Sequence, residues 1–276
     1  MTEQYHTLIS AEELATLMAS HEPLRIFDCR AQLGKPQRGA ELFALGHIAG
    51  ALHADLDLHL AAPPDHRGRH PLPNRDDWLA QVQRWGLLNH EQVVVYDDAG
   101  GQMAARAWWM MRWLGHDRVA VLDGGLPNWS MPLETGPAQQ PTPSSFAAKA
   151  PLTRLWQVDQ VTANLQSQDH TMVDARSEIR FRGEAEPIDP VAGHIPNAIC
   201  LPSTDNLTAT GEFKSPEALG QRFAGLATDK TVCYCGSGVT ATHNILAMTI
   251  AGLQEPALYA DSWSGWITDS SRPIER

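Results

Sequence analysis

Short apolar runs alternate with amphipathic stretches along most of the chain. In the first half, residues 25–28, 92–96 and 119–122 are apolar runs bounded by turn-forming residues, which predicts strands. Residues 76–85 and 103–114 carry apolar positions at helical spacing, which predicts helices. Strands that alternate with helices favour a mostly parallel sheet flanked by helices. The pattern therefore predicts an α/β fold with functional sites at the carboxyl ends of its strands.

The chain also repeats itself. Four segments of the first half recur in the second half, in the same order and at similar offsets: 27–30 and 173–176, 46–51 and 193–198, 93–96 and 231–234, 122–129 and 259–266. Four ordered matches indicate two copies of one domain. Between the copies, a run rich in Pro, Gln and Ser has little to bury and predicts an extended linker. We expect a first domain over 1–135, a linker over 136–150 and a second domain over 151–276.

Composition and charge exclude several classes of protein. Of the 276 residues, 43% are hydrophobic and 19% are charged, as in ordinary globular domains. The formal net charge is −11 and no run or stripe of Lys and Arg occurs, so we expect no nucleic-acid partner. No apolar run approaches the roughly 20 residues of a membrane span, and the first residues do not form a secretory signal. These features predict a cytoplasmic protein without a membrane partner.

Four cysteines, at positions 29, 200, 233 and 235, are too few and too scattered for a disulfide framework. Cys235 differs from the others because it ends an apolar strand and precedes a Gly/Ser loop and a mostly apolar helix, predicted over 240–253. A thiol in this place lies at the positive end of a helix dipole, which favours the thiolate. We expect a reactive Cys235 and three cysteines in or near the core.

The loop after Cys235 has the composition of an anion-binding site. Its residues are Gly236, Ser237, Gly238, Val239 and Thr240. The two glycines permit positive φ, so successive N–H groups can point inward, and the two hydroxyls can add donors. Such a loop can stabilise a persulfide on Cys235; the alternative is a structural cysteine in a glycine turn. The first half has Asp97 at the equivalent position, so we expect the first domain to be non-catalytic.

Taken together, these residues carry a family resemblance. The tandem repeat, the Asp-x-Arg pairs, the Gly-His-Ile segments and the cysteine loop resemble two-domain rhodanese-type sulfurtransferases over nearly the whole length. The loop Cys-Gly-Ser-Gly-Val-Thr-Ala is similar to that of 3-mercaptopyruvate sulfurtransferases. The resemblance implies two rhodanese-like domains that move a sulfane sulfur through a persulfide on Cys235, without metal or organic cofactor. It implies a small-molecule donor and acceptor, the acceptor being cyanide or a thiol, including a protein thiol.

The resemblance implies a cationic donor site as well. Arg180 matches the substrate-binding arginine of the family best, and Arg182 lies in the same segment. A guanidinium suits a carboxylate or a sulfonate-like group; the alternative is a solvated surface arginine. A second family arginine should follow Arg180 by about nine positions, but this chain has Asp189 there. This departure weakens the match to 3-mercaptopyruvate as the donor.

Members of the mercaptopyruvate type also use an Asp and a His near the loop serine. Asp57 and His70 are the nearest matches, and an Asp–His–Ser237 chain can move a proton during sulfur transfer. Their spacing differs slightly from the family pattern, and His70 can instead order a Pro-rich loop. The competitors are Asp55, Asp65 and His66.

Several duplicated residues favour structural roles. Asp-x-Arg follows a strand in both halves, at 28–30 and 174–176, so ion pairs that anchor loops are expected there, and His47 and His194 recur likewise. After Tyr259 the family usually has Asp-Gly, whereas this chain has Ala-Asp, so we expect different local geometry there.

Three alternative functions compete with the mercaptopyruvate reaction. A thiosulfate sulfurtransferase would use the same chemistry with another donor, and the missing second arginine favours it. A non-enzymatic persulfide carrier would need the same Cys235. A phosphatase of the related cysteine-loop type would need an arginine at position 241, which is Ala.

Overall fold

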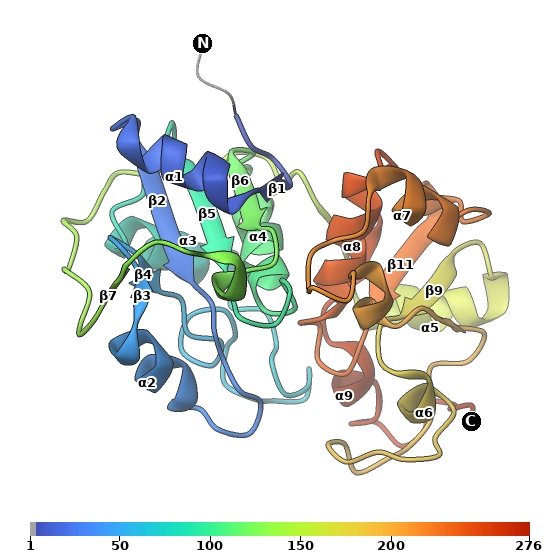
Figure 1. The fold of residues 1–276 in the computed structure, drawn as a ribbon. Coiled ribbons are helices and arrows are strands. Elements are labelled where there is room, and N and C mark those ends of the chain that lie inside the picture. Colours follow the sequence, from blue (N-terminus) through green and yellow to red (C-terminus); the bar gives the residue numbers. More distant parts are fainter. Residues whose placement is uncertain (1–3) are drawn as a thin grey trace. The chain divides into compact units, whose positions relative to one another are not determined.

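The chain folds into two compact units in a computed structural model, which describes residues 4–276 (Figure 1). Unit 1 contains the described residues up to Ala62, Pro73–Leu152 and the short piece Ala209–Glu212. Unit 2 contains Thr153–Thr208 and Phe213–Arg276, together with Pro63–Leu72 from the first half of the sequence. Unit 2 is therefore assembled from both halves of the chain.

Unit 1 is built around a five-stranded parallel sheet of strand order β1-β6-β5-β2-β4. Its strands are β1 Leu8–Ile9, β2 Leu24–Asp28, β3 His47–Ile48, β4 Leu52–His53, β5 Gln92–Tyr96, β6 Val119–Leu122 and β7 Leu133–Glu134, where β3 and β7 form a separate antiparallel pair. Its helices are α1 Ala11–Ala19, α2 Arg38–Leu45, α3 Arg75–Arg84, α4 Ala104–Trp113 and the 3₁₀ turn Leu126–Asn128.

Unit 2 repeats this plan with the parallel order β10-β9-β11-β12-β8. Its strands are β8 Arg154–Trp156, β9 Thr171–Asp174, β10 Ile199–Cys200, β11 Thr231–Tyr234 and β12 Ala257–Tyr259. Its helices are α5 Val158–Ser167, α6 Glu178–Phe181, α7 Pro216–Arg222, α8 Ala241–Ile250, α9 Ser262–Trp266 and the 3₁₀ turns Ser203–Asn206 and Thr228–Lys230. Read from the β4 or β10 edge, the two sheets have the same strand order, which confirms the predicted α/β duplication.

The sequence pattern located the central elements closely. The strands expected at 92–96 and 119–122 match β5 and β6, and the helices expected at 76–85 and 103–114 match α3 and α4 within a residue. The helix expected over 240–253 is shorter, because α8 ends at Ile250 and Gly252 takes φ 73° after it. A left-handed glycine beyond the last turn is a common way to end a helix.

The core of each unit lies between its sheet and its helices. β5 and β11 are buried at every position, because helices cover parallel sheets on both faces. α4 and α8 are also buried over most of their length. In α8 this burial includes Asn244, whose side chain donates to the Leu201 carbonyl at 2.8 Å and accepts from Asn206 at 2.7 Å. Paired polar groups of this kind avoid the cost of burial without a partner.

The duplicated Asp-x-Arg pairs are structural, as predicted. Nη2 of Arg30 lies 2.5 Å from Asp28 Oδ2 and donates to the Gly46 carbonyl at 2.6 Å. In unit 2, Arg176 makes the same two contacts, with Asp174 and with the Gly193 carbonyl, both at 2.7 Å. Each arginine therefore fastens a loop to the end of a central strand.

Two further features concern chain organisation. Residues 136–150 contain no helix or strand, and part of this segment is fastened to unit 1 by hydrogen bonds from Ser144 N to Gln83 O and from Lys149 N to Leu114 O, both 2.8 Å. Within residues 4–276, no helix has both the length and the apolar character that crossing a membrane would require.

Candidate active site

Cys235 directly follows β11, a central strand of the unit 2 sheet, and opens the loop that leads into α8 (Figure 1). Only 2% of its surface is exposed. Val239 and Thr240 form the first turn before α8, since their carbonyl oxygens accept hydrogen bonds from the N–H groups three residues further on. The thiol therefore lies one short loop before the N-terminus of a buried ten-residue helix, as predicted.

The two loop glycines serve different purposes. Gly238 has φ 73°, and a Cβ there would lie 2.1 Å from the Ala260 carbonyl oxygen. Both the backbone conformation and the available space therefore require glycine at 238. Gly236 does not have positive φ, so the expectation that it would contribute a left-handed residue is wrong. A Cβ on Gly236 would lie 3.0 Å from Nη2 of Arg69, so this glycine leaves room for a guanidinium.

The first residues of α9 hold the cysteine loop in place. The Cys235 N–H donates to Ser262 Oγ at 3.1 Å, and Ser262 Oγ donates to the Tyr259 carbonyl at 3.0 Å. Two further N–H groups, of Trp263 and Ser264, donate to the Cys235 and Gly236 carbonyls at 3.0 and 2.9 Å. Sequence reasoning missed Ser262.

A signal for Ser262 was present in the repeat. The matched segments 122–129 and 259–266 place Ser262 at the position of Gly125. Gly125 has φ 63° and Ser262 has φ 55°, so a serine has kept the left-handed conformation of a glycine turn. Non-glycine residues in this region are uncommon, and their strain is compensated by surrounding contacts. At the predicted departure itself, Asp261 has φ −64° where the matched Gly124 has φ 72°, so the backbone differs there, as expected, before Ser262 returns to the left-handed conformation.

His70 and Ser237 come together within unit 2. Nδ1 of His70 lies 2.8 Å from Ser237 Oγ, so a proton can pass between the imidazole and the hydroxyl. Asp57 belongs to unit 1, where its N–H donates to Asp55 Oδ1 at 2.9 Å. Burial and the neighbouring Asp55 charge raise the pKa of the Asp57 carboxyl. Its participation in an Asp–His–Ser chain stays a prediction.

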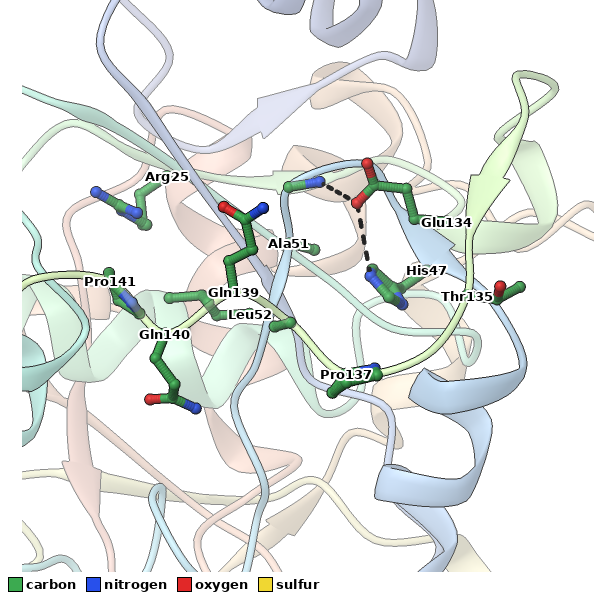
Figure 2. Close-up of a pocket in the computed structure, with 12 residues that line it drawn as sticks. Arg25, His47, Ala51, Leu52, Glu134, Thr135, Pro137, Gln139, Gln140 and Pro141 are labelled. Atoms are coloured by element: carbon green, nitrogen blue, oxygen red, sulfur yellow. Dashed lines mark hydrogen bonds and ion pairs between the residues drawn. The ribbon is translucent and has the colours of Figure 1, made fainter.

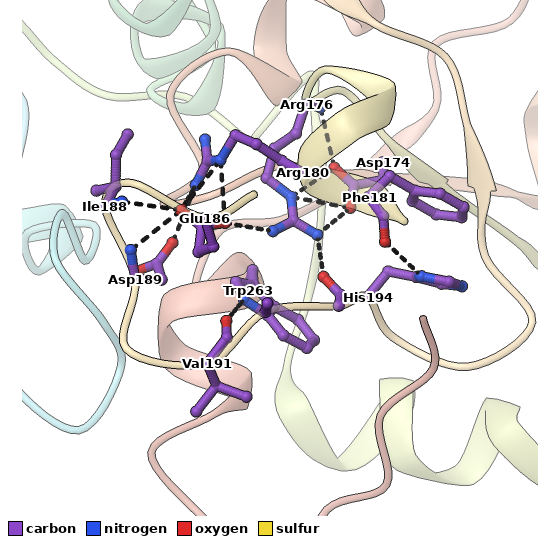
Figure 3. A network of polar contacts seen from close by, with 12 residues as sticks. Asp174, Arg176, Arg180, Phe181, Glu186, Ile188, Asp189, Val191, His194 and Trp263 are labelled. Carbon is purple, nitrogen blue, oxygen red and sulfur yellow. Dashed lines mark hydrogen bonds and ion pairs between the residues drawn. The ribbon is translucent and has the colours of Figure 1, made fainter. Parts of the chain in front are cut away.

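Arg180 lies in a network of alternating charges that Figure 3 shows from close by. Its guanidinium forms a two-pronged pair with Glu186, at 2.8 to 3.1 Å, and Nη2 also lies 3.2 Å from Asp189 Oδ2. Burial disfavours the Glu186 carboxylate, but hydrogen bonds from Arg180 and from backbone N–H groups outweigh it and lower its pKa. Both η nitrogens of Arg180 approach Gly236, at 3.4 and 3.5 Å from where its Cβ would be.

Asp189 stands where the family pattern placed a second arginine. Its side chain is 2% exposed and forms an ion pair with Arg69 as well as with Arg180. Burial raises the pKa of Asp189, although both arginines oppose this effect. Arg182, the other predicted donor-binding arginine, is half-exposed on the surface and pairs with Glu178 and Glu184, each at 2.7 Å. Its two partners are exposed carboxylates that do not belong to the network of Arg180.

The other three thiols lie in environments that keep them protonated. Burial raises the pKa of Cys29 and of Cys233 far above the ordinary value, and it raises the pKa of Cys200 to about 12. All four cysteines are free thiols. Since the thiolate is the nucleophile, three of them are poor candidates for sulfur chemistry. No cluster of His, Cys, Asp or Glu side chains suited to a metal ion occurs within the described part of the chain.

Unit 1 carries an anion of its own at the place of the thiol. Oδ1 of Asp97 accepts hydrogen bonds from the N–H groups of Ala99 and Gly101, at 2.9 and 2.8 Å. Oδ2 accepts from Met103 and Ala104, at 2.7 and 2.9 Å. Four backbone donors thus converge on one carboxylate before α4. The loop before α4 is therefore an anion cradle, which the Asp97 side chain fills.

A hollow of about 640 Å³ also lies in unit 1, beneath residues 137–141 (Figure 2). At one end, Glu134 Oε2 accepts from the Gly50 N–H at 2.9 Å and lies 3.8 Å from His47 Nε2. His47 also stacks on Phe43 and hydrogen-bonds its carbonyl through Nδ1 at 2.8 Å. These contacts give His47 the structural role expected from its duplication. No cysteine lines this hollow, so it is not a candidate site for sulfur transfer.

Comparisons with known proteins agree with this geometry. The family model for the rhodanese-like domain matches residues 10–132 and again residues 157–269. The chain is 46% identical to a probable 3-mercaptopyruvate sulfurtransferase of Pseudomonas aeruginosa, over 97% of each sequence. It is 37% identical to a putative thiosulfate sulfurtransferase of Mycobacterium tuberculosis, over 100% of this chain and 99% of that one. In structure it is similar to the 3-mercaptopyruvate sulfotransferase SseA from Escherichia coli, with a TM-score of 0.79, 31% identity, and 95% and 100% of the two chains covered.

Proposed function

The chain belongs to the rhodanese-like domain family, and we propose that it moves a sulfane sulfur from 3-mercaptopyruvate to a thiophilic acceptor through a persulfide on Cys235. The observation that carries the proposal is the cysteine loop. A thiol at the start of a helix, two guanidiniums beside Gly236 and a His70–Ser237 hydrogen bond converge on one short segment. Each supplies a part that sulfur transfer requires.

In the first half-reaction, the Cys235 thiolate attacks the sulfur of the donor. A sulfur–sulfur bond forms, the carbon–sulfur bond of the donor breaks, and its electron pair stays on the carbon. That carbon takes up a proton to give pyruvate, while the transferred sulfur remains on Cys235 as a persulfide. The loop N–H groups and the helix N-terminus stabilise the negative charge of this persulfide.

His70 and Ser237 serve this step as a proton relay. The 2.8 Å contact between His70 Nδ1 and Ser237 Oγ allows the imidazole to supply a proton through the hydroxyl to the departing carbon. We propose that Asp57 assists His70 in this relay. Arg180 binds the carboxylate of the donor, since its η nitrogens face the loop and its remaining bonds fix its position.

In the second half-reaction, cyanide or a thiol attacks the outer sulfur of the persulfide. The sulfur–sulfur bond breaks, its electrons return to Cys235 as the thiolate, and thiocyanate or a new persulfide departs. We propose that a protein thiol can also accept the sulfur. The domain over 151–276, completed by Pro63–Leu72, is the catalytic one in this scheme, and a reducing cytoplasm suits its thiol.

Intact-protein mass spectrometry tests the proposal directly. Incubation with 3-mercaptopyruvate without an acceptor should add the mass of one sulfur atom, and cyanide should remove it. Cys235→Ser should abolish both the added mass and thiocyanate production while leaving the circular dichroism spectrum unchanged. Cys200→Ser is the matched control, because burial raises the pKa of the Cys200 thiol. This variant should keep both the added mass and the thiocyanate production. Substantial transfer by folded Cys235→Ser protein would contradict the mechanism.

Thiosulfate is the second candidate donor. The acidic side chain at 189 and the name of the mycobacterial relative favour it. Comparison of kcat/KM for the two donors, with cyanide as the shared acceptor, decides between them. A higher value for thiosulfate would replace 3-mercaptopyruvate in the proposal. Thiocyanate production with neither donor, together with a persulfide loaded by another protein, would instead support a dedicated carrier.

A further inference from the structure

A second cation approaches the cysteine loop although the expected arginine at 189 is absent. Arg69 comes from Pro63–Leu72, the segment of the first half that belongs to unit 2. Its Nη2 lies 3.0 Å from where a Cβ on Gly236 would be, which is closer than either η nitrogen of Arg180. Two guanidiniums therefore flank the residue that follows the nucleophile.

Asp189 fixes the position of this second cation. One Nη of Arg69 forms an ion pair with Asp189, whose side chain is 2% exposed and whose other oxygen contacts Arg180. The Asp189 carboxylate thus fixes the positions of both guanidiniums. A buried carboxylate between two arginines can do this, because each ion pair offsets part of its desolvation.

The backbone of Arg69 is tied to the same frame as the loop. Its N–H donates to Ser264 Oγ at 3.1 Å, and the Ser264 N–H donates to the Gly236 carbonyl at 2.9 Å. Arg69 also lines an open hollow of about 310 Å³ in unit 2, with Asp189 and Ser264.

The charges of the four side chains around this position balance. Arg69 and Arg180 lie toward Gly236, whereas Glu186 and Asp189 pair with them. Arg69 Nη2 and Arg180 Nη1, which both face the loop, donate no hydrogen bond to any residue in the described part of the chain. Such a site offers directed donors without excess positive charge, which suits a monoanionic carboxylate better than a dianion.

We propose that Arg69 is the donor-binding residue that replaces the missing second arginine, and that it contacts the carboxylate of the donor together with Arg180. Asp189 acts as its positioning residue. The proposal rests on the proposed function, because it assigns a role toward the same donor. Under this proposal, a residue from the first half of the sequence helps the site in unit 2 to select a donor that carries a carboxylate.

Steady-state kinetics on the full-length chain test the assignment. Arg69→Gln keeps an amide that can donate to Asp189 but removes the donors facing the loop. A charge-assisted hydrogen bond contributes about 1.5–3 kcal/mol, so kcat/KM for 3-mercaptopyruvate should fall roughly 10- to 100-fold, mainly through KM. The inhibition constant of pyruvate, which keeps the carboxylate, should rise by a similar factor. Arg38→Ala, a surface arginine paired with Glu41 in unit 1, is the matched control and should change neither constant.

A second variant separates donor binding from a structural role. In Arg69→Gln/Asp189→Arg, a guanidinium returns to position 189, so KM should recover most of the loss seen in Arg69→Gln alone. Unchanged KM and pyruvate inhibition in Arg69→Gln would overturn the assignment. The assignment would also be overturned if Arg69→Gln lowered kcat alone and the double variant did not restore kcat. An unmodified chain inactive with 3-mercaptopyruvate would overturn the proposed function instead, so the two failures are distinguishable.

Discussion

Replacement of Asp97 by Ala tests whether the loop before α4 is an anion cradle. The carboxylate accepts four backbone N–H groups, and the residue itself is 1% exposed. Water can reach the N–H of exposed Ala99 after the change. The N–H groups of Gly101 and Ala104 are buried and would lose their partner.

The magnitude follows from these four donors. Each buried N–H left without an acceptor costs about 1–3 kcal/mol, so the two fully buried donors alone predict a loss of about 4 kcal/mol in the free energy of unfolding. Asp97→Asn should cost about half as much, because its Oδ1 still accepts two hydrogen bonds while its NH₂ group faces the other donors. Asp98→Ala is the matched control, since this neighbouring side chain is exposed, and it should cost less than about 0.5 kcal/mol.

Urea unfolding followed by circular dichroism measures these differences, and hydrogen exchange resolves them by segment. The amides of 99–113 should lose protection in Asp97→Ala, because α4 begins within the cradle. A loss below about 1 kcal/mol with unchanged protection would refute the reasoning, since a carboxylate with four donors cannot then be the element that orders the loop.

Three further predictions follow from the site and the core. Gly238→Ala should lower the melting temperature and impair sulfur transfer, because φ 73° costs an alanine about 1–2 kcal/mol and its Cβ would overlap the Ala260 carbonyl; unchanged melting and activity would contradict this. Ser262→Ala removes the acceptor of the Cys235 N–H at 3.1 Å and should slow persulfide formation about tenfold in stopped-flow or quench measurements; an unchanged rate would contradict this. Burial lowers the pKa of His116 to about 4, so the unfolded state alone binds this proton between pH 6.5 and 4. Stability should therefore fall by about 3 kcal/mol as the pH drops through that window, and His116→Gln should flatten the urea-midpoint profile.

The sequence predicted the features that depend on local pattern or on duplication. The Asp-x-Arg pairs and the cysteine loop were recognisable because each is a short motif with one physical reason. The contact between His70 and Ser237 came from the family resemblance, since nothing in the spacing of two residues so far apart fixes a distance.

Arg69 and Ser262 were missed for a different reason. Both depend on which segments pack together, and Arg69 reaches the loop only because Pro63–Leu72 belongs to unit 2. A search for the second arginine along the chain from Arg180 could find only Asp189. Ser262 was accessible in principle, because the repeat aligns it with a left-handed glycine, but its hydrogen bond to the Cys235 backbone follows only from coordinates.

The assignment of Pro63–Leu72 to unit 2 has a consequence for how this gene can evolve. The half without the thiol encodes Arg69 and His70, so a shortened gene that begins after the linker would lose both side chains together with the half it discards. The duplication produced two domains of the same fold. Through Pro63–Leu72, however, unit 2 also contains residues from the first half of the sequence. In the proposed scheme, the first half of the sequence therefore supplies two side chains to the site, and its loss would impair sulfur transfer.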